Sequence, residues 1–185
     1  MIFFMQRDFA NENSWDFNVS GDASKVIFIS NSGSIDPIDL AVNVKLIDLK
    51  INHMVNFVTP YLISTSIAKI TQQKKIPFYI FNISSGASIQ AVSGWSAYCS
   101  SKAAIRISLD CIAKENSLVS VAHFDPGVMD TEMQRKIRSS SQKKMYNQQT
   151  FIDYFAHGKL KHPKNVAVKV LSSIESFINE NCHNL

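Results

Sequence analysis

Short apolar runs alternate along this chain with longer stretches of helical periodicity. Three runs have strand length and are apolar with β-branched residues: Val26 to Ile29, Phe78 to Ile83 and Leu118 to Phe124. Residues 46–69, residues 98–114 and a stretch that starts at His162-Pro163 repeat apolar positions at helical spacing. Strands that alternate with helices predict an α/β protein with a parallel sheet.

Other segments are less regular. Ile2-Phe3-Phe4-Met5 is typical of a brief buried strand that ends near Asp8, and residues 11–23 carry a weak amphipathic pattern that predicts a helix. Pro60 should kink the helix over residues 46–69, because an interior proline removes a hydrogen bond. Residues 131–161 have no clear period, which favours a mobile cover.

The stretch from Phe78 to Lys102 combines a strand, a polar turn and the start of a helix. Ser85 follows the strand, at the edge where open α/β sheets bind ligands. Tyr98 and Lys102 stand four residues apart, so their side chains share one helix face. A nearby ammonium lowers the pKa of a phenol, so we expect Tyr98 to exchange a proton near neutral pH. Ser85 would hold a carbonyl oxygen while Tyr98 protonates it.

Length and composition predict one domain over residues 1–185, since 185 residues with 45% hydrophobic content can bury one sizeable core. The formal charge of +4 is spread without a dense basic stripe, so nucleic acid is not an expected partner. Cys99, Cys111 and Cys182 form no C-x-x-C pair and have no metal-ligand spacing, which favours a reducing cytoplasmic setting and no metal site. The apolar N-terminus is too short for a signal or a membrane span.

The combination of a strand, Ser85 and Tyr98-Cys99-Ser100-Ser101-Lys102 resembles the signature of the short-chain dehydrogenase/reductase family. The resemblance implies that Ser85, Tyr98 and Lys102 are catalytic, together with a helix asparagine, for which we favour Asn52 over Asn56. GWSAYCSSKAA and DPGVMDTEMQRKIRS are most similar to the benzil reductase and sepiapterin reductase branch. That likeness implies reduction of small diketones or pterin-like carbonyl compounds with NADPH.

The resemblance also implies a site for NADP(H). Asp8 would lie beside the adenine ring, and the turn formed by Asn31, Ser32 and Gly33 would line the ribose. The nicotinamide end would be held by Pro126, Gly127, Val128, Thr131, Tyr98 and Lys102. Asp125 stands where the family commonly has a small residue.

The sequence contains no glycine-rich turn of the kind that receives a dinucleotide pyrophosphate, because no two of its six glycines are close enough. In the family this turn follows the first strand. Its absence predicts a truncated Rossmann-like fold of three layers with a parallel sheet, without the family's first two strands and its last strand. Val26 to Ile29 would then have an unpaired edge, unless the N-terminal segment or a second chain pairs with it.

Three hypotheses follow. The first is an NADPH-dependent carbonyl reductase, for which the resemblance implies a homodimer, since paired helices in the family bury a dimer or tetramer interface. The second is a non-catalytic remnant of such a reductase with weak or no cofactor binding, motivated by the missing glycine turn. The third, a nucleic-acid-binding domain, rests only on the mild positive charge.

Overall fold

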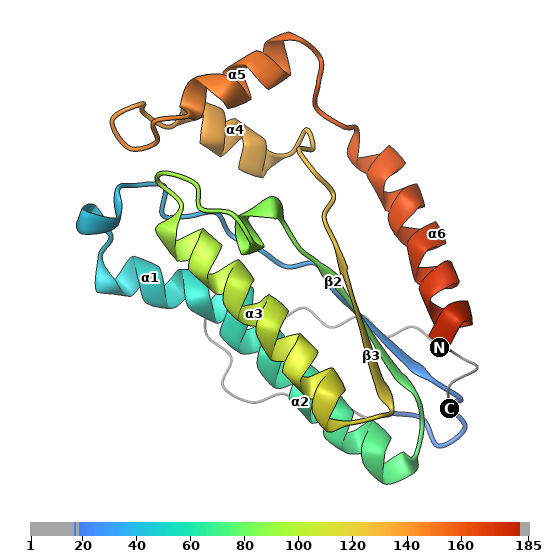
Figure 1. Ribbon diagram of the computed structural model, residues 1–185. Helices are drawn as coiled ribbons and strands as arrows, with labels where there is room; N and C mark the ends of the chain where they lie inside the picture. Colours follow the sequence, from blue (N-terminus) through green and yellow to red (C-terminus); the bar gives the residue numbers. More distant parts are fainter. Residues whose placement is uncertain (1–16, 18, 182–185) are drawn as a thin grey trace.

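A computed structural model describes residue 17 and residues 19–181. Its centre is a parallel sheet in the order β1 (Val26–Ser30), β2 (Phe78–Ile83) and β3 (Val119–Phe124). Val26 pairs with Phe78, which pairs in turn with Val119. Helices α2 (Thr59–Lys74) and α3 (Ser96–Glu115) cover one face, and α6 (Pro163–Asn181) covers the other (Figure 1). The predicted α/β, Rossmann-like three-layer arrangement is confirmed.

Strand β2 is the middle of this sandwich because both of its faces meet a helix. Phe78 and Ile80 pack with residues of α2 and α3, among them Ile105 and Leu109. Tyr79 and Phe81, which point the other way, pack against α6. A strand buried on both faces has no alternation of polar and apolar residues, which explains the unbroken apolar run in the sequence.

The long helix around Pro60 is continuous but irregular. It consists of α1 (Leu46–His53), a π-helical turn η2 (Met54–Val58) and α2. Pro60 lies in the first turn of α2, directly after the π turn, so the predicted kink takes the form of a local widening of the helix. The helix ends at Lys74, further along than Lys69, where Lys75 adopts a left-handed conformation with φ 56°.

Residues 131–161 hold two helices, α4 (Glu132–Ser139) and α5 (Gln148–Ala156), although the sequence shows no clear period there; the mobility expected of this cover stays a prediction. Figure 1 shows both helices above the carboxyl ends of the strands. They are fixed by packing, because Ile137, Met145 and Phe151 are buried in a cluster with Trp95 and Tyr98. Short 3₁₀ turns, η1 (Ala41–Asn43) and η3 (Gly86–Ser88), complete the elements.

The segment before β1 is only partly described. The strand expected over residues 2–5 and the cofactor contact Asp8 lie outside the described residues. The helix expected over residues 11–23 is wrong where it can be compared, since residues 19–23 are not helical. A hydrogen bond between the Ser20 hydroxyl and the Asp22 carboxylate closes a turn around Gly21 there.

The edge of β1 away from β2 has no strand beside it in the described part of the chain. Ile27 and Ile29, which point to the same face as Tyr79 and Phe81, are 42% and 44% exposed. The predicted open edge therefore holds for the described residues. In that same part of the chain, every helix is too short or too polar to cross a membrane.

Candidate active site

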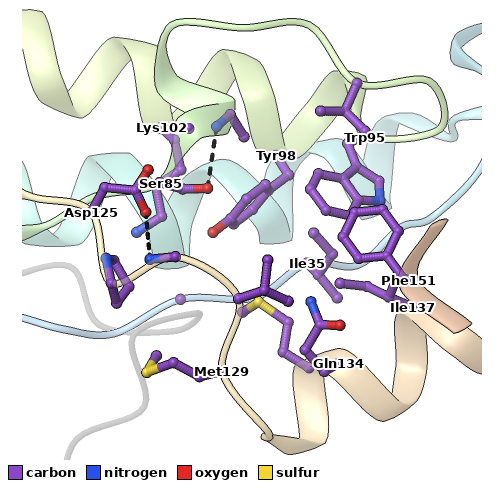
Figure 2. Close-up of a pocket in the computed structure, with 18 of the residues that line it drawn as sticks. Ile35, Ser85, Trp95, Tyr98, Lys102, Asp125, Met129, Gln134, Ile137 and Phe151 are labelled. Carbon is purple, nitrogen blue, oxygen red and sulfur yellow. Dashed lines mark hydrogen bonds between the residues drawn. The ribbon is translucent and has the colours of Figure 1, made fainter. Parts of the chain in front are cut away.

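Ser85, Tyr98 and Lys102 all line one cavity of about 460 Å³ at the carboxyl end of β2 (Figure 2). Ser85 follows the strand in an extended conformation, and its hydroxyl oxygen accepts a hydrogen bond from the Ala87 amide at 3.2 Å. Tyr98 and Lys102 lie one turn apart near the start of α3. The cavity has the volume of a pocket for a small organic ligand.

The Tyr98 phenol is 6% exposed and lies within hydrogen-bonding reach of Ser85. Burial raises the pKa of Tyr98 above its ordinary value of 10, the hydrogen bond with Ser85 lowers it, and the negative charge of Asp125 raises it again. The net direction is upward. The expectation that Lys102 makes this phenol acidic is therefore wrong for the protein alone, because burial outweighs the other influences.

Lys102 is 5% exposed and turns its ammonium toward the main chain. Its Nζ donates a hydrogen bond to the Ile83 carbonyl at 3.2 Å and lies 5.9 Å from the centre of the Tyr98 ring. Burial lowers the pKa of Lys102 to about 8, because a buried ammonium loses its hydration. A buried amine that titrates near neutral pH is typical of a functional site.

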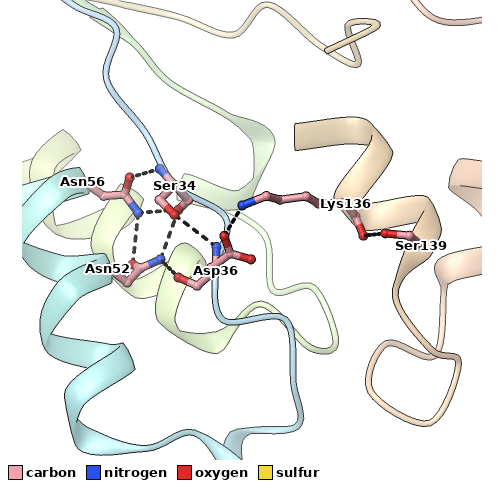
Figure 3. A network of polar contacts seen from close by, with 6 residues as sticks. All are labelled: Ser34, Asp36, Asn52, Asn56, Lys136 and Ser139. Carbon is pink, nitrogen blue, oxygen red and sulfur yellow. Dashed lines mark hydrogen bonds and ion pairs between the residues drawn. The ribbon is translucent and has the colours of Figure 1, made fainter. Parts of the chain in front are cut away.

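Two buried asparagines clamp the turn that follows β1 (Figure 3). The Asn56 side chain accepts a hydrogen bond from the Ser34 amide at 2.8 Å and donates one to the Ser34 carbonyl at 2.8 Å. Asn52 donates to the carbonyls of Ser34 and Asp36, at 3.1 and 2.6 Å. Asn56 in turn donates to the Asn52 side-chain oxygen at 3.0 Å.

Asn52 does not line the cavity. Asn56 does not line it either, but a Cβ built on Gly33 would lie 3.5 Å from the Asn56 Oδ1 and 3.7 Å from the Lys102 Nζ. A catalytic role of Asn52 stays a prediction. The structure gives both asparagines a role in holding the turn, and Asn56 and Lys102 both approach Gly33.

The residues expected to bind the cofactor are largely gathered around the same cavity. Lining residues from that set are Asn31, Gly33, Tyr98, Lys102, Pro126, Gly127, Val128 and Thr131, whereas Ser32 does not line it. The residues expected to hold the nicotinamide end thus lie around one cavity, and their role in binding it stays a prediction. No glycine-rich turn for the pyrophosphate occurs among residues 19–181.

Lys161 does not line the cavity but supports a loop that does, a role that the sequence did not reveal. Its Nζ donates to the Pro126 carbonyl at 3.1 Å, and its amide donates to the Val128 carbonyl at 2.9 Å. It packs so closely on Gly127, which has φ 66°, that a Cβ there would lie 2.7 Å from the Nζ. Lys161 thus holds the loop after β3 in place from a position 35 residues further along the chain.

Asp125 and an apolar wall complete the cavity. The Asp125 Oδ1 accepts a hydrogen bond from the Gly127 amide at 2.8 Å, and Figure 2 shows its carboxylate beside Ser85. On the other side of Tyr98 lie Ile35, Trp95, Ile137 and Phe151, with the amide of Gln134 among them. Within the described residues, no group of three His, Cys, Asp or Glu side chains could hold a metal ion.

Comparison with known proteins agrees with this geometry. The family model for short chain dehydrogenases matches residues 26–142. The benzil reductase of Bacillus subtilis, which forms (S)-benzoin, is 35% identical over 156 residues, covering 82% of this chain and 64% of that protein. The sepiapterin reductase of Xenopus tropicalis is 30% identical over 119 residues, covering 61% of this chain and 44% of that protein.

The crystal structure of the KRED1-Pglu enzyme superposes with a TM-score of 0.68 at 27% identity, covering 76% of this chain and 59% of that one. The present chain thus spans about two thirds or less of each of these three proteins.

Proposed function

This chain belongs to the short-chain dehydrogenase family, and we propose that its cavity is the active site of an NADPH-dependent reductase of small carbonyl compounds. The observation that carries the proposal is the meeting of Ser85 and Tyr98 in one cavity with the buried ammonium of Lys102 behind them. Phenol, hydroxyl and ammonium are the groups needed to grip and protonate a carbonyl oxygen.

Each side chain has a role that follows from its surroundings. Ser85 donates a hydrogen bond to the substrate carbonyl oxygen, and Tyr98 transfers its proton to that oxygen as the carbonyl carbon is reduced. A raised pKa keeps Tyr98 protonated at neutral pH, which suits a proton donor. When bound, NADPH supplies the hydride. Lys102, Asn31 and Gly33 would hold its ribose, and Pro126, Gly127, Val128 and Thr131 would hold its nicotinamide.

A diketone or pterin-like substrate is proposed on two grounds. The sequence resembles benzil and sepiapterin reductases, and the apolar wall of Trp95, Phe151 and Ile137 suits an aromatic ring. Preference for NADPH rests on that resemblance alone. A reducing cytoplasmic setting is proposed because Cys99 and Cys111 are free thiols.

The test is the oxidation of NADPH in the presence of benzil, compared between the wild-type chain and Tyr98→Phe. We expect the variant to lose about 10²- to 10⁴-fold in kcat, because it lacks the proton donor. Circular dichroism should show an unchanged fold. The assay is run over a wide range of NADPH concentration, so that weak cofactor binding raises KM without hiding kcat. Equal rates in both proteins would refute the mechanism.

A non-catalytic remnant is the second candidate. It is favoured by the absence of a glycine-rich turn among residues 19–181 and by the exposed face of Ile27 and Ile29. Any ligand that binds the native state raises the melting temperature by mass action. The remnant hypothesis therefore expects no rise in melting temperature with millimolar NADPH, whereas the reductase hypothesis expects a clear rise.

We also propose that the chain forms a homodimer through α1. Its outer face exposes Leu46, Ile47 and Ile51, an apolar surface that a second copy could cover. Light scattering after size-exclusion chromatography should give twice the mass of 20.8 kDa. Ile47→Glu should give the monomer, and a wild-type monomer would exclude the dimer.

A further inference from the structure

Two buried polar atoms in the cavity have no hydrogen-bond partner in the described structure. These are the side-chain oxygen Oε1 of Gln134 and the indole nitrogen Nε1 of Trp95. Gln134 is 7% exposed and Trp95 is 6% exposed, and both line the cavity that holds Ser85 and Tyr98. Buried polar side chains in folded proteins nearly always have a partner, so two unpartnered atoms in one pocket need an explanation.

The position of these atoms points to a ligand. Gln134 lies on α4, and Figure 2 shows its amide on the Trp95 side of Tyr98, away from Ser85 and Asp125. The surrounding side chains, Ile35, Ile137 and Phe151, are apolar and offer the amide nothing to bind. A carbonyl compound held between Ser85 and Tyr98 would extend past the phenol into this region.

We infer that Gln134 and Trp95 form a polar subsite that binds a second hydrogen-bonding group of the substrate. The Gln134 oxygen needs a donor and the Trp95 nitrogen needs an acceptor, so the complementary group carries both, as a primary amide or a lactam does. The inference rests on the proposed reductase function for the position of the reacting carbonyl. It adds a substrate class: carbonyl compounds with an amide or lactam several ångströms from the ketone.

Two probes test the subsite. One is benzil with a para-carbamoyl group, and the other is benzil with a para-methoxycarbonyl group, which is similar in size but has no N–H. Calorimetry in the presence of NADP⁺, which cannot reduce them, gives the dissociation constants. In the wild-type chain the carbamoyl probe should bind roughly tenfold more tightly, because it alone satisfies the Gln134 oxygen. In Gln134→Met this preference should vanish.

A matched control separates binding from folding. Gln148 is also buried, but its amide donates hydrogen bonds to the carbonyls of Arg138 and Ser140, and it does not line the cavity. Gln148→Met should lower the melting temperature and keep the probe preference. Gln134→Met should not lower it, because no hydrogen bond of the protein is lost.

Several results would overturn the subsite: no binding of either probe, equal affinity of both probes in the wild-type chain, a preference that persists in Gln134→Met, or a melting temperature of Gln134→Met below that of Gln148→Met. Failure of the proposed function looks different. In that case neither probe is reduced by NADPH, while the difference in affinity and its loss in Gln134→Met are still measured.

Discussion

The Lys102 ammonium donates a hydrogen bond to the Ile83 carbonyl at 3.2 Å, at the point where β2 ends and the Ser84-Ser85 turn begins. This contact ties the start of α3 to the end of the central strand. The lysine is buried there, and the loss of hydration of its ammonium lowers the pKa of Lys102 to about 8. Two predictions depend on that buried charge.

The first concerns stability. In the unfolded chain Lys102 keeps the ordinary lysine pKa of 10.5, so below pH 8 the native state carries the cost of a buried ammonium. Lys102→Met should therefore increase the free energy of unfolding at pH 7 by about 1–3 kcal/mol. This is a net value, from which the loss of the hydrogen bond to the Ile83 carbonyl has been subtracted. As the pH rises from 8 to 10.5 the native lysine becomes neutral first, and the advantage of the variant should disappear.

Urea unfolding at several pH values measures this effect. Lys114→Met is the matched control, because Lys114 is exposed on the same helix and should show little change. A Lys102→Met chain that is less stable than wild type at pH 7 would mean that the contact with Ile83 outweighs the burial of the charge.

The second prediction concerns the pH dependence of catalysis. Lys102 is charged below about pH 8, whereas the raised pKa of Tyr98 keeps the phenol protonated well beyond that point. We expect kcat/KM for benzil to fall about tenfold per pH unit above the Lys102 pKa. In Lys102→Arg the residual activity should not fall there, since a guanidinium does not titrate in this range. If kcat/KM still falls near pH 8 in Lys102→Arg, a group other than Lys102 is responsible for the fall.

The third prediction concerns Asp125. Its negative charge helps to raise the pKa of Tyr98, and its carboxylate lies beside Ser85 where a substrate must bind. Asp125→Asn should lower the Tyr98 pKa, measured by ultraviolet titration against Tyr98→Phe. It should also increase kcat/KM for the anion phenylglyoxylate relative to neutral 1-phenyl-1,2-propanedione by roughly three- to tenfold, because a repulsive charge is removed.

Asp130→Asn is the control for Asp125, since it removes one carboxylate from the same loop at an exposed position that does not line the cavity. If both variants change the ratio equally, the effect is that of net charge. The preference between the charged and the neutral substrate would then not come from a contact of Asp125 with the substrate.

The fourth prediction concerns the clamp on the turn after β1. Asn56→Ala would leave the Ser34 amide without its side-chain partner, remove one of the two side-chain donors to the Ser34 carbonyl and deprive Ser101 of a contact at 3.2 Å. We expect a loss of about 2–4 kcal/mol in the free energy of unfolding. Asn43→Ala removes an exposed hydrogen bond to Asp39 and should cost less than about 0.5 kcal/mol. Similar losses in both variants would contradict the clamp.

The sequence could predict the centre of the fold because its signals there are local. An apolar run marks β2, a helical period marks α3, and the rule that ligands bind at strand ends places Ser85 opposite Tyr98. Lys161 and Gln134 carry no such signal. They come from segments well after α3, and only tertiary packing brings Gln134 to the cavity and Lys161 to the loop after β3.

The sequence also could not predict the direction in which the pKa of Tyr98 is shifted. Sequence spacing places a lysine one turn away, but it does not say that both side chains are almost fully buried or that the ammonium turns to Ile83. Desolvation depends on everything packed around the phenol, including α5 through Phe151. The sign of the pKa change therefore depends on contacts that span the chain.

The π-helical turn at Met54–Val58 has a consequence for how this chain tolerates insertions and deletions. A π turn holds one residue more than an α turn, so a helix that loses one residue there, other than Asn56, can close as a regular α-helix. The side chains of Asn52 and Asn56 would then stay on the face that meets Ser34. A single codon lost here should thus do less harm than one lost from the middle of α2, where each residue turns the helix by about 100°.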